Sequence, residues 1–447
     1  MALRDVLPDT WIESDGSVSV GGVALSAIAE RYGTPAYVFD VAHIEARFGD
    51  LNSALEGLGQ PVYATKAFLC TAFAELLASS GWWADVVSLG EAENVRRGGV
   101  PSDRILLHGN LKTDAELALA VRGDVAITVI DSLDELARLA AAASVAGSVV
   151  DVMIRLNEDV DLATHPLVLT SGDEAKFGMV PGEAAKAVAQ IVASPALRMR
   201  GVHLHVGSQA TDPGLYGVII QRLVEFVALH RDAFPISPIL LDAGGGLAAP
   251  YVRTDPVIDP VEVVEEMRVA LAESGALDRI GATEILLEPG RWLVANAGVL
   301  LYTIGVRKPL PAGGELVALD GGMTDNPRPA LYGAKYELLS IDNPSASAET
   351  LFRVFGRMCE SDVLLDSIML PSATATGDLV AMPAAGAYTF SMSSRYNGLR
   401  RPPVLFVREG QVREVVRRET IDDVLAGEFS LGRAPSWTYN AIGDDHR

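Results

Sequence analysis

The 447-residue sequence predicts an α/β protein, a (β/α)8 barrel of the TIM type followed by a C-terminal all-β domain of Greek-key-like character. Short apolar segments alternate with amphipathic segments through the first two thirds of the chain, which is typical of parallel βα units. After about residue 297 the helical patterns largely vanish, and apolar segments separated by Gly, Pro and Asn turns follow. A barrel takes roughly 250 residues, so the length leaves room for a second domain.

The barrel is expected to occupy residues 37–296. Its eight candidate strands are 61–66, 84–88, 104–108, 125–131, 151–156, 199–206, 238–243 and 283–288. Their nearly continuous apolar composition indicates burial on both faces. Eight such units in a row favour a closed barrel, and an open doubly wound sheet is the alternative on this pattern alone.

Residues 1–36 are expected to form a separate segment that packs with the C-terminal domain, 297–447, because chain termini often meet. Asp15-Gly16 predicts the turn of a small hairpin. Residues 23–32 have helical spacing and end at Gly33, a suitable C-cap. The strands expected in the C-terminal domain are 299–306, 315–319, 351–356, 363–369, 378–382, 404–408 and 411–416.

Charge and cysteine content exclude several classes of function. The net charge of −22 disfavours nucleic acid and anionic membrane surfaces as partners. Two cysteines allow at most one disulfide, and no apolar run approaches the roughly 20 residues of a membrane-spanning helix. The N-terminus leads into no apolar signal core. We therefore expect a cytoplasmic protein.

Ionisable residues gather at the predicted carboxyl ends of the strands, where (β/α)8 barrels carry their chemistry. Lys66 ends the first strand, and a desolvated amine loses its charge more readily and becomes a nucleophile. This pattern fits a lysine that forms a Schiff base with the aldehyde of pyridoxal phosphate (PLP). A surface lysine whose stem covers apolar residues is the structural alternative.

Other strand ends supply what such a lysine would need. His203 and His205 share one face of a strand, and an aromatic wall over a flat cofactor is favoured over a metal pair because no third ligand follows at a suitable spacing. Gly244-Gly245-Gly246 can bring backbone N–H groups to a phosphate, or can simply form a tight turn. Glu288 can face a protonated pyridine nitrogen, or can pair with a nearby arginine.

The C-terminal domain contains a cysteine and two acids within four residues, Cys359-Glu360-Ser361-Asp362. We interpret this segment as a general acid beside a carboxylate that faces the substrate. Zinc is poorly supported because there is no second cysteine pair, and no metal is expected. Cys70 has no such neighbours and is expected to be structural.

Taken together, these motifs resemble the diaminopimelate decarboxylase family of PLP enzymes, which have an alanine-racemase-like fold. The matching stretches occur in family order and cover about residues 35–430: 63–67 (YATKA), 205–209 (HVGSQ), 244–247 (GGGL), 288–291 (EPGR), 320–323 (DGGM), 359–361 (CES), 386–388 (GAY) and 393–397 (SSRYN). Phe68 stands where many members have Asn, and the segment after Glu360 looks one residue shorter than the common form.

The resemblance implies a cofactor site built on Lys66, which would carry the aldimine, and on His205, which would stack on the ring. It implies that Asp85 and Arg155 lie near the lysine and the ring. The phosphate and the pyridine nitrogen would be held by Ser208, Gly244, Gly245, Gly246, Glu288, Gly290, Arg291 and Tyr388.

The resemblance also implies a substrate site. Arg291, Arg328 and Tyr332, with Tyr388 nearby, would bind the distal carboxylate, and Glu360 the distal amine. Cys359 would donate the proton after carbon dioxide leaves. Cys359 and Glu360 would reach into the neighbouring subunit's site, which implies an obligatory homodimer with composite active sites.

The activity implied is loss of carbon dioxide from the D-centre of meso-2,6-diaminopimelate, which gives L-lysine in the last step of lysine biosynthesis. One alternative is a related PLP decarboxylase of ornithine, arginine or carboxynorspermidine. Two arginines in the site would repel the distal amine of such substrates. An alternative of another class is a non-catalytic or regulatory barrel that carries PLP, and the intact Cys359-Glu360 pair argues against it.

Overall fold

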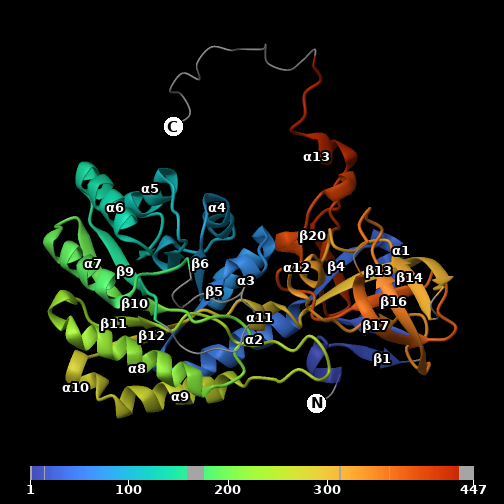
Figure 1. Cartoon of the computed structure of the whole chain (residues 1–447), viewed down its shortest axis with the longest axis horizontal. Helices are drawn as coiled ribbons and strands as arrows, with labels where there is room; N and C mark the ends of the chain where they lie inside the picture. Colours follow the sequence, from blue (N-terminus) through green and yellow to red (C-terminus); the bar gives the residue numbers. More distant parts are fainter. Residues whose placement is uncertain (1–2, 15, 159–175, 312–313, 362, 432–447) are drawn as a thin grey trace.

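The computed structural model describes residues 3–14, 16–158, 176–311, 314–361 and 363–431. They form two lobes, a barrel surrounded by helices and a lobe of β-strands, arranged along the long axis of the molecule (Figure 1). Within these ranges, no helix is both long and apolar enough to cross a membrane.

The first lobe is a closed barrel of eight parallel strands, as predicted. In order around the ring the strands are β5 (Gly59–Ala64), β6 (Trp83–Val86), β7 (Ile105–Leu107), β8 (Ile127–Ile130), β9 (Val150–Leu156), β10 (Leu197–Leu204), β11 (Ile239–Asp242) and β12 (Thr283–Leu287). The ring closes where Leu286 of β12 pairs with Gln60 of β5. This closure excludes the open sheet.

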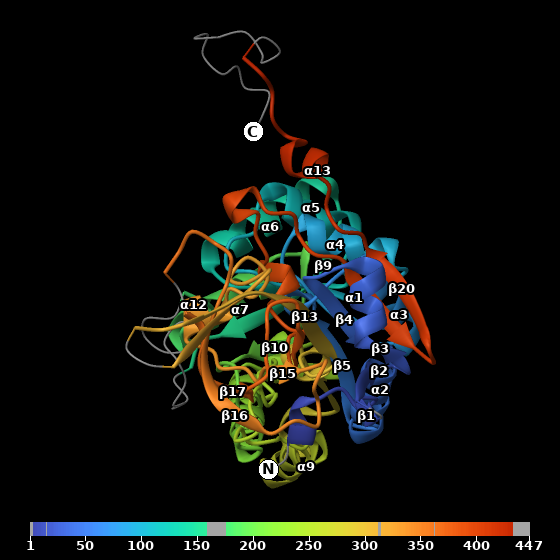
Figure 2. The same cartoon turned by 90° about the vertical axis from the view of Figure 1, so that its right-hand side faces the viewer.

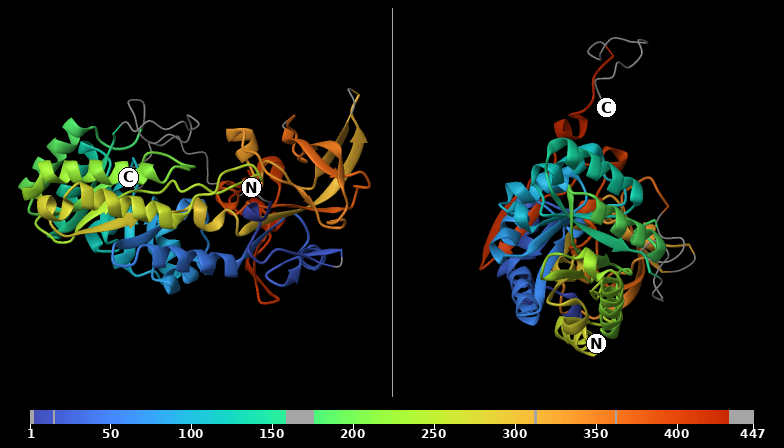
Figure 3. Two further views of the ribbon diagram at one scale, coloured as in Figure 1. Left: turned by 90° about the horizontal axis from the view of Figure 1, so that it is seen from below. Right: turned by 90° about the vertical axis from the view of Figure 1, so that its left-hand side faces the viewer.

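Helices surround the barrel strands (Figure 3, right). They are α2 (Val41–Ala54), α3 (Thr71–Ser80), α4 (Leu89–Arg97), α5 (Asp114–Arg122), α6 (Leu133–Ala146), α7 (Pro181–Ala193), α8 (Gly214–Leu229), α9 (Pro260–Glu273) and α10 (Ala276–Ile280). Apolar side chains such as Val62, Leu106 and Met153 form a separate cluster contributed by the barrel strands, and each is fully buried. The barrel is therefore a packed core with its chemistry at one end.

Three functional strand ends were expected one or two residues too late. β5 ends at Ala64, and Lys66 lies in the 3-10 turn η2 (Thr65–Ala67) that follows. His205 and Glu288 each lie one residue beyond their strands, β10 and β12. The apolar pattern continues past the last inter-strand hydrogen bonds, because the residues that flank these three, such as Ala67, Val206 and Pro289, are packed inside the protein.

The second lobe is a β domain, as predicted, and its sheet is mixed (Figure 2). Its strands are β4 (Ala36–Asp40), β13 (Gly298–Pro309), β14 (Glu315–Leu319), β15 (Leu339–Ser340), β16 (Ala348–Phe355), β17 (Val363–Pro371), β18 (Leu379–Met382), β19 (Val404–Arg408) and β20 (Gln411–Val416). The pairs β14–β16 and β4–β19 are parallel. Three short helices that the sequence pattern did not predict follow β12: α11 (Arg291–Val294) before the β domain, and α12 (Arg328–Tyr332) and α13 (Ile421–Leu425) within the C-terminal part.

The N-terminal segment forms the turn η1 (Leu3–Val6), a small sheet of β1 (Ile12–Ser14), β2 (Ser17–Val20) and β3 (Val23–Ala24), and helix α1 (Leu25–Tyr32). The expected hairpin is β1–β2, and Asp15 of its turn lies outside the described residues. The helix begins two residues later than expected and ends at Gly33, where φ is +71°. Trp11 and Leu25 share an apolar cluster with Leu405 of the β domain.

Strand β4 connects the two lobes. It pairs with β13 and β19, so residues 36–40 lie in the sheet of the β domain, beyond the boundary expected at residue 36. The carboxylate of Asp40 then accepts hydrogen bonds from the backbone N of Ala42 and His43 and caps α2, the first barrel helix. The chain therefore passes from one lobe to the other at Asp40.

Candidate active site

A cavity of about 550 Å³ lies between the carboxyl ends of the barrel strands and the β domain. Its wall contains most of the residues predicted for the site, namely Lys66, His205, Ser208, Gly245, Gly246, Glu288, Gly290, Arg291, Arg328, Tyr332 and Tyr388. Asp85 and Arg155 are buried and interact electrostatically with Lys66 without lining the cavity. Gly244 precedes the two glycines of the wall.

The backbone on both sides of Lys66 is held by the two lobes. The Thr65 hydroxyl donates to the carbonyl of Asp85 at 2.8 Å, and the backbone N of Tyr388 in the β domain donates to the carbonyl of Ala67 at 2.8 Å. Phe68 stacks on Phe39 of β4 with 4.2 Å between ring centroids. The lysine side chain is accessible through the cavity, although the strand before it is buried.

The charge of Lys66 differs from the expectation based on desolvation alone. Burial lowers the pKa of the amine, but Asp85, Tyr388 and Glu288 together outweigh it and raise the pKa above its ordinary value. In the protein without ligands the amine is therefore held as a cation. A positive amine surrounded by acidic groups is a stable resting form for a lysine that must stay inside a cavity.

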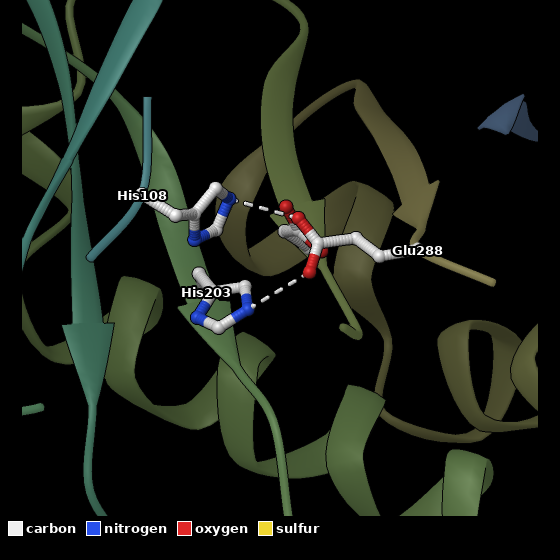
Figure 4. Close-up of side chains that lie close together, drawn as sticks. His108, His203 and Glu288 are labelled. Atoms are coloured by element: carbon white, nitrogen blue, oxygen red, sulfur yellow. Dashed lines mark ion pairs between the residues drawn. The ribbon is translucent and has the colours of Figure 1, made fainter. Parts of the chain in front are cut away.

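Glu288 lies beside two histidines from other strands (Figure 4). Its Oε1 is 2.9 Å from Nε2 of His108, and its Oε2 is 3.4 Å from Nε2 of His203. Burial raises the pKa of Glu288, but the two imidazoles outweigh it and hold the pKa well below its ordinary value. The carboxylate is consequently ionised and faces the cavity from a buried position.

Burial keeps three of the groups near Glu288 uncharged. Burial lowers the pKa of His203 to about 3 and that of His205 well below its ordinary value. Burial and the neighbouring Glu288 raise the pKa of Asp242 well above its ordinary value, so this acid keeps its proton. Glu288 is thus ionised beside a neutral His203 and a neutral Asp242, and it can accept a cationic partner.

The same cluster contradicts one step of the sequence argument. The possible ligand atoms of His108, His203, Asp242 and Glu288 all lie within 4.8 Å of one another, so further metal-binding groups do stand beside His203. They come from the ends of β7, β11 and β12, and only closure of the barrel brings them together. They are far from His203 in the sequence, so spacing along the chain gives no sign of them.

Backbone packing explains the three glycines. A Cβ at Gly245 would lie 2.2 Å from the carbonyl oxygen of Glu288, and a Cβ at Gly246 would lie 2.5 Å from the carbonyl oxygen of Gly207. Gly244 and Gly246 also have φ of +65° and +106°. The close packing of this turn against two other loops excludes any side chain, and it leaves Gly245 and Gly246 in the cavity wall.

Two arginines form the other side of the cavity. Arg291 donates to the hydroxyl of Ser208 at 3.0 Å and to the hydroxyl of Tyr251 at 2.5 Å. Arg328 donates to the hydroxyl of Tyr336 and lies over the ring of Tyr251 at 4.4 Å. Both arginines are buried, and neither forms an ion pair with any residue in the described ranges.

Cys359 and Glu360 are exposed and do not line the cavity of their own chain. The backbone N of Cys359 donates to the side-chain carbonyl of Asn397 at 3.0 Å, and the hydroxyl of Tyr396 donates to Glu360. Asp362 of the same segment lies outside the described residues. Within one chain, this segment is therefore not brought together with Lys66.

Several residues at the site could not be predicted, or could be predicted only in part, from the sequence. His108, Asp242 and Asp131 each lie at the end of an expected strand, yet no role beside Glu288 or Arg155 is predicted for them, and His203 is predicted only as part of an aromatic wall. Position at a strand end was the available signal for these four. Tyr251 and Tyr336 lie in loops without a periodic pattern, so only the fold reveals them.

Comparisons with known proteins agree with this geometry. Residues 41–295 match the model of the pyridoxal-dependent decarboxylase family, pyridoxal binding domain. The diaminopimelate decarboxylases of Bacillus subtilis and Actinosynnema pretiosum are 36% and 39% identical to this chain, over 92% of its length and 94% and 93% of theirs. The crystal structure of the M. jannaschii diaminopimelate decarboxylase in co-complex with L-lysine has a TM-score of 0.88 at 30% identity, covering 95% of this chain and 98% of that one. The chain belongs to the diaminopimelate decarboxylase family of pyridoxal-dependent decarboxylases.

Proposed function

We propose that this protein decarboxylates meso-2,6-diaminopimelate to L-lysine and carbon dioxide, with PLP as cofactor, in the last step of lysine biosynthesis. The observation that carries the proposal is the buried pair Arg291 and Arg328, which lines the same cavity as Lys66 without an ion-pair partner in the described part of the chain. Buried cations require an anion, and guanidinium groups match a carboxylate with two bonds. A substrate with a second carboxylate supplies that anion.

The residues of the cavity fit PLP. Lys66 offers an amine for the aldehyde, and Glu288 offers an ionised carboxylate for a protonated ring nitrogen. Ser208, with the bare backbone of Gly245 and Gly246, offers groups for the phosphate. When bound, PLP accepts the electrons left by the breaking C–C bond.

The other residues of the barrel end have positioning roles in this proposal. His205 presents a neutral imidazole to the cavity, because burial, Lys66 and Arg155 all lower its pKa. A neutral ring can serve as a flat wall without competing with Lys66 for the cofactor's charges. Asp85 compensates the positive charge of Lys66 and keeps that side chain in the cavity.

We assign the distal end of the substrate to Arg291, Arg328, Tyr332 and Tyr388, because these side chains line the part of the cavity that the β domain closes. Cys359 is the proposed proton donor and Glu360 the proposed partner of the distal amine. Both belong to a neighbouring subunit's site in this scheme. Their exposure, and their absence from the cavity of their own chain, support a homodimer with composite sites.

Mixing two inactive variants tests the composite site. Lys66→Ala and Cys359→Ala chains, each inactive alone, should regain about a quarter of the wild-type activity when mixed in equal amounts and exchanged, because half of the dimers then carry one intact site. Mixing two Lys66→Ala preparations is the control. No recovery after confirmed subunit exchange would place Cys359 in its own chain's site or outside the reaction.

Assays on meso-diaminopimelate, ornithine and arginine separate the proposed activity from its neighbours in the family. The distal amine of ornithine would face two buried guanidinium groups, and like charges repel at that distance. Rates on ornithine equal to or above those on meso-diaminopimelate would rule out the proposal. Turnover of any of these substrates would dismiss a non-catalytic barrel that merely carries PLP.

Both cysteines are free, which suits a reducing compartment, and we propose the cytoplasm as the location.

A further inference from the structure

We propose that Tyr251 determines the specificity of this enzyme by holding Arg291 and Arg328 as a single carboxylate-binding pair. This inference rests on the proposed function and names a residue that the family motifs do not include. Tyr251 is 5% exposed and lines the cavity. Its hydroxyl accepts the hydrogen bond from Arg291, and its ring lies 4.4 Å from the guanidinium carbon of Arg328.

The contacts of Tyr251 fix both arginines without neutralising them. Its ring faces Arg328, and the ring of Tyr336 meets it nearly at right angles, with 5.1 Å between centroids. Burial lowers the pKa of Arg328, but Tyr251 and Tyr336 outweigh it and raise the pKa. A carboxylate in the place of Tyr251 would hold the arginines equally well but would cancel the charge that the substrate needs. A tyrosine holds both guanidinium groups in position and leaves their positive charge available to the substrate.

The loop that carries Tyr251 is held by one internal contact and by one contact with the β domain. The carboxylate of Asp255 accepts hydrogen bonds from the backbone N of Tyr251 at 2.8 Å and of Val252 at 3.1 Å. Arg253 forms a two-bond ion pair with Glu337, with both N–O distances at 3.0 Å. Glu337 follows Tyr336 in the β domain. The ion pair therefore attaches the loop of Tyr251 to the β domain next to Tyr336.

This arrangement makes the distal site a product of both lobes. Arg291 follows β12 of the barrel, and Arg328 begins α12 of the β domain. Tyr251 contacts both of them, so the spacing of the two guanidinium groups depends on its hydroxyl and on its ring. Without the hydroxyl of Tyr251, Arg291 keeps only its hydrogen bond to Ser208 and can turn toward it. The two guanidinium groups that would bind one carboxylate then move apart.

The test is Tyr251→Phe in the PLP-loaded enzyme, which keeps the ring and removes the hydroxyl. L-lysine carries the distal carboxylate of the substrate, and cadaverine lacks it. We expect the Kd of L-lysine to rise by about tenfold, the size expected when a hydrogen bond to a charged group is lost, with little change for cadaverine. The KM for meso-diaminopimelate should rise by a similar factor while kcat changes less than about threefold.

Tyr302→Phe is the matched control, because Tyr302 is a buried tyrosine of β13 whose hydroxyl has no hydrogen-bond partner in the described ranges. It should bind L-lysine like the wild type. If Tyr251→Phe does not fold or loses PLP, Glu337→Ala provides the second test, since it detaches the loop from outside the cavity. This variant should raise the Kd of L-lysine by about threefold, the effect expected when a partly exposed ion pair is lost.

The outcomes separate the two proposals. Wild-type enzyme that loads PLP but does not turn over meso-diaminopimelate contradicts the proposed function. Active wild-type enzyme together with unchanged L-lysine binding in Tyr251→Phe, or in Glu337→Ala where the first variant fails to fold, overturns the role of Tyr251. An equal loss of L-lysine and cadaverine binding also overturns it, because that result indicates a general structural defect.

Discussion

The two sides of the cavity differ in how their charges are balanced. At the barrel end, Lys66 faces Asp85 and Glu288, and Glu288 in turn lies against His108 and His203. At the side formed with the β domain, Arg291 and Arg328 meet tyrosine rings and hydroxyl groups and no carboxylate of the described chain. A balanced set of charges suits a group that stays bound. An unbalanced pair of cations suits an anionic ligand that binds and leaves.

Removal of Lys66 should have the largest effect. Lys66→Ala is expected to lower kcat by at least about 10³-fold, because the variant has no amine to form the Schiff base with the cofactor's aldehyde. The wild type should show the yellow absorbance of protein-bound PLP and lose it on borohydride reduction. The variant should not show this absorbance, because it has no amine to form the Schiff base. Lys186→Ala, an exposed lysine of α7, is the control. A variant without the amine that keeps this absorbance would show that another group holds the cofactor.

Arg328→Gln removes one of the two cations on the side of the cavity formed with the β domain. We expect kcat/KM for meso-diaminopimelate to fall by roughly 10- to 150-fold, since hydrogen bonds to charged groups contribute about 1.5–3 kcal/mol. The value for D-lysine, which has no distal carboxylate, should stay constant or rise. Steady-state kinetics on both compounds measure this effect. A proportional loss on both substrates would mean that Arg328 does not bind the carboxylate.

A smaller effect, on the affinity for PLP, is expected from a change in the histidines that contact Glu288 at the barrel end of the cavity. His203→Gln removes one of the two imidazoles that hold the pKa of Glu288 low, so the carboxylate should be protonated more readily. We expect the apoenzyme to bind PLP about tenfold more weakly. Fluorescence titration with PLP measures the change, and His230→Gln at the end of α8 is the control. Unchanged affinity would show that His108 alone suffices.

Asp325, which does not line the cavity, provides a test of stability. Burial raises the pKa of this acid to about 7, so its contribution to stability is complete below about pH 4 and is lost as the pH rises toward 7. Between pH 5.5 and 7.5 the loss is about 2 kcal/mol at most. Asp325→Asn should therefore unfold at a less pH-dependent temperature than the wild type. Parallel melting temperatures at both pH values would refute the raised pKa.

The same contrast explains how much could be predicted from sequence. The barrel, the β domain and Lys66 were accessible, because periodicity and short motifs are local properties. The partners of Glu288 were not, since His108 and His203 come from β7 and β10 and meet Glu288 only when the ring closes. Tyr251 has no sequence signal because it lies in an irregular loop. The charge of Lys66 was misjudged, because desolvation was weighed without the three acidic groups that outweigh it.

The central claim is that the enzyme recognises the distal carboxylate of its substrate. The most direct measurement compares kcat/KM of the PLP-loaded enzyme for meso-diaminopimelate and for D-lysine, which differ only in that carboxylate. Two buried guanidinium groups without a partner predict a preference for meso-diaminopimelate of at least about 100-fold. Equal values, or a preference for D-lysine, would contradict the account.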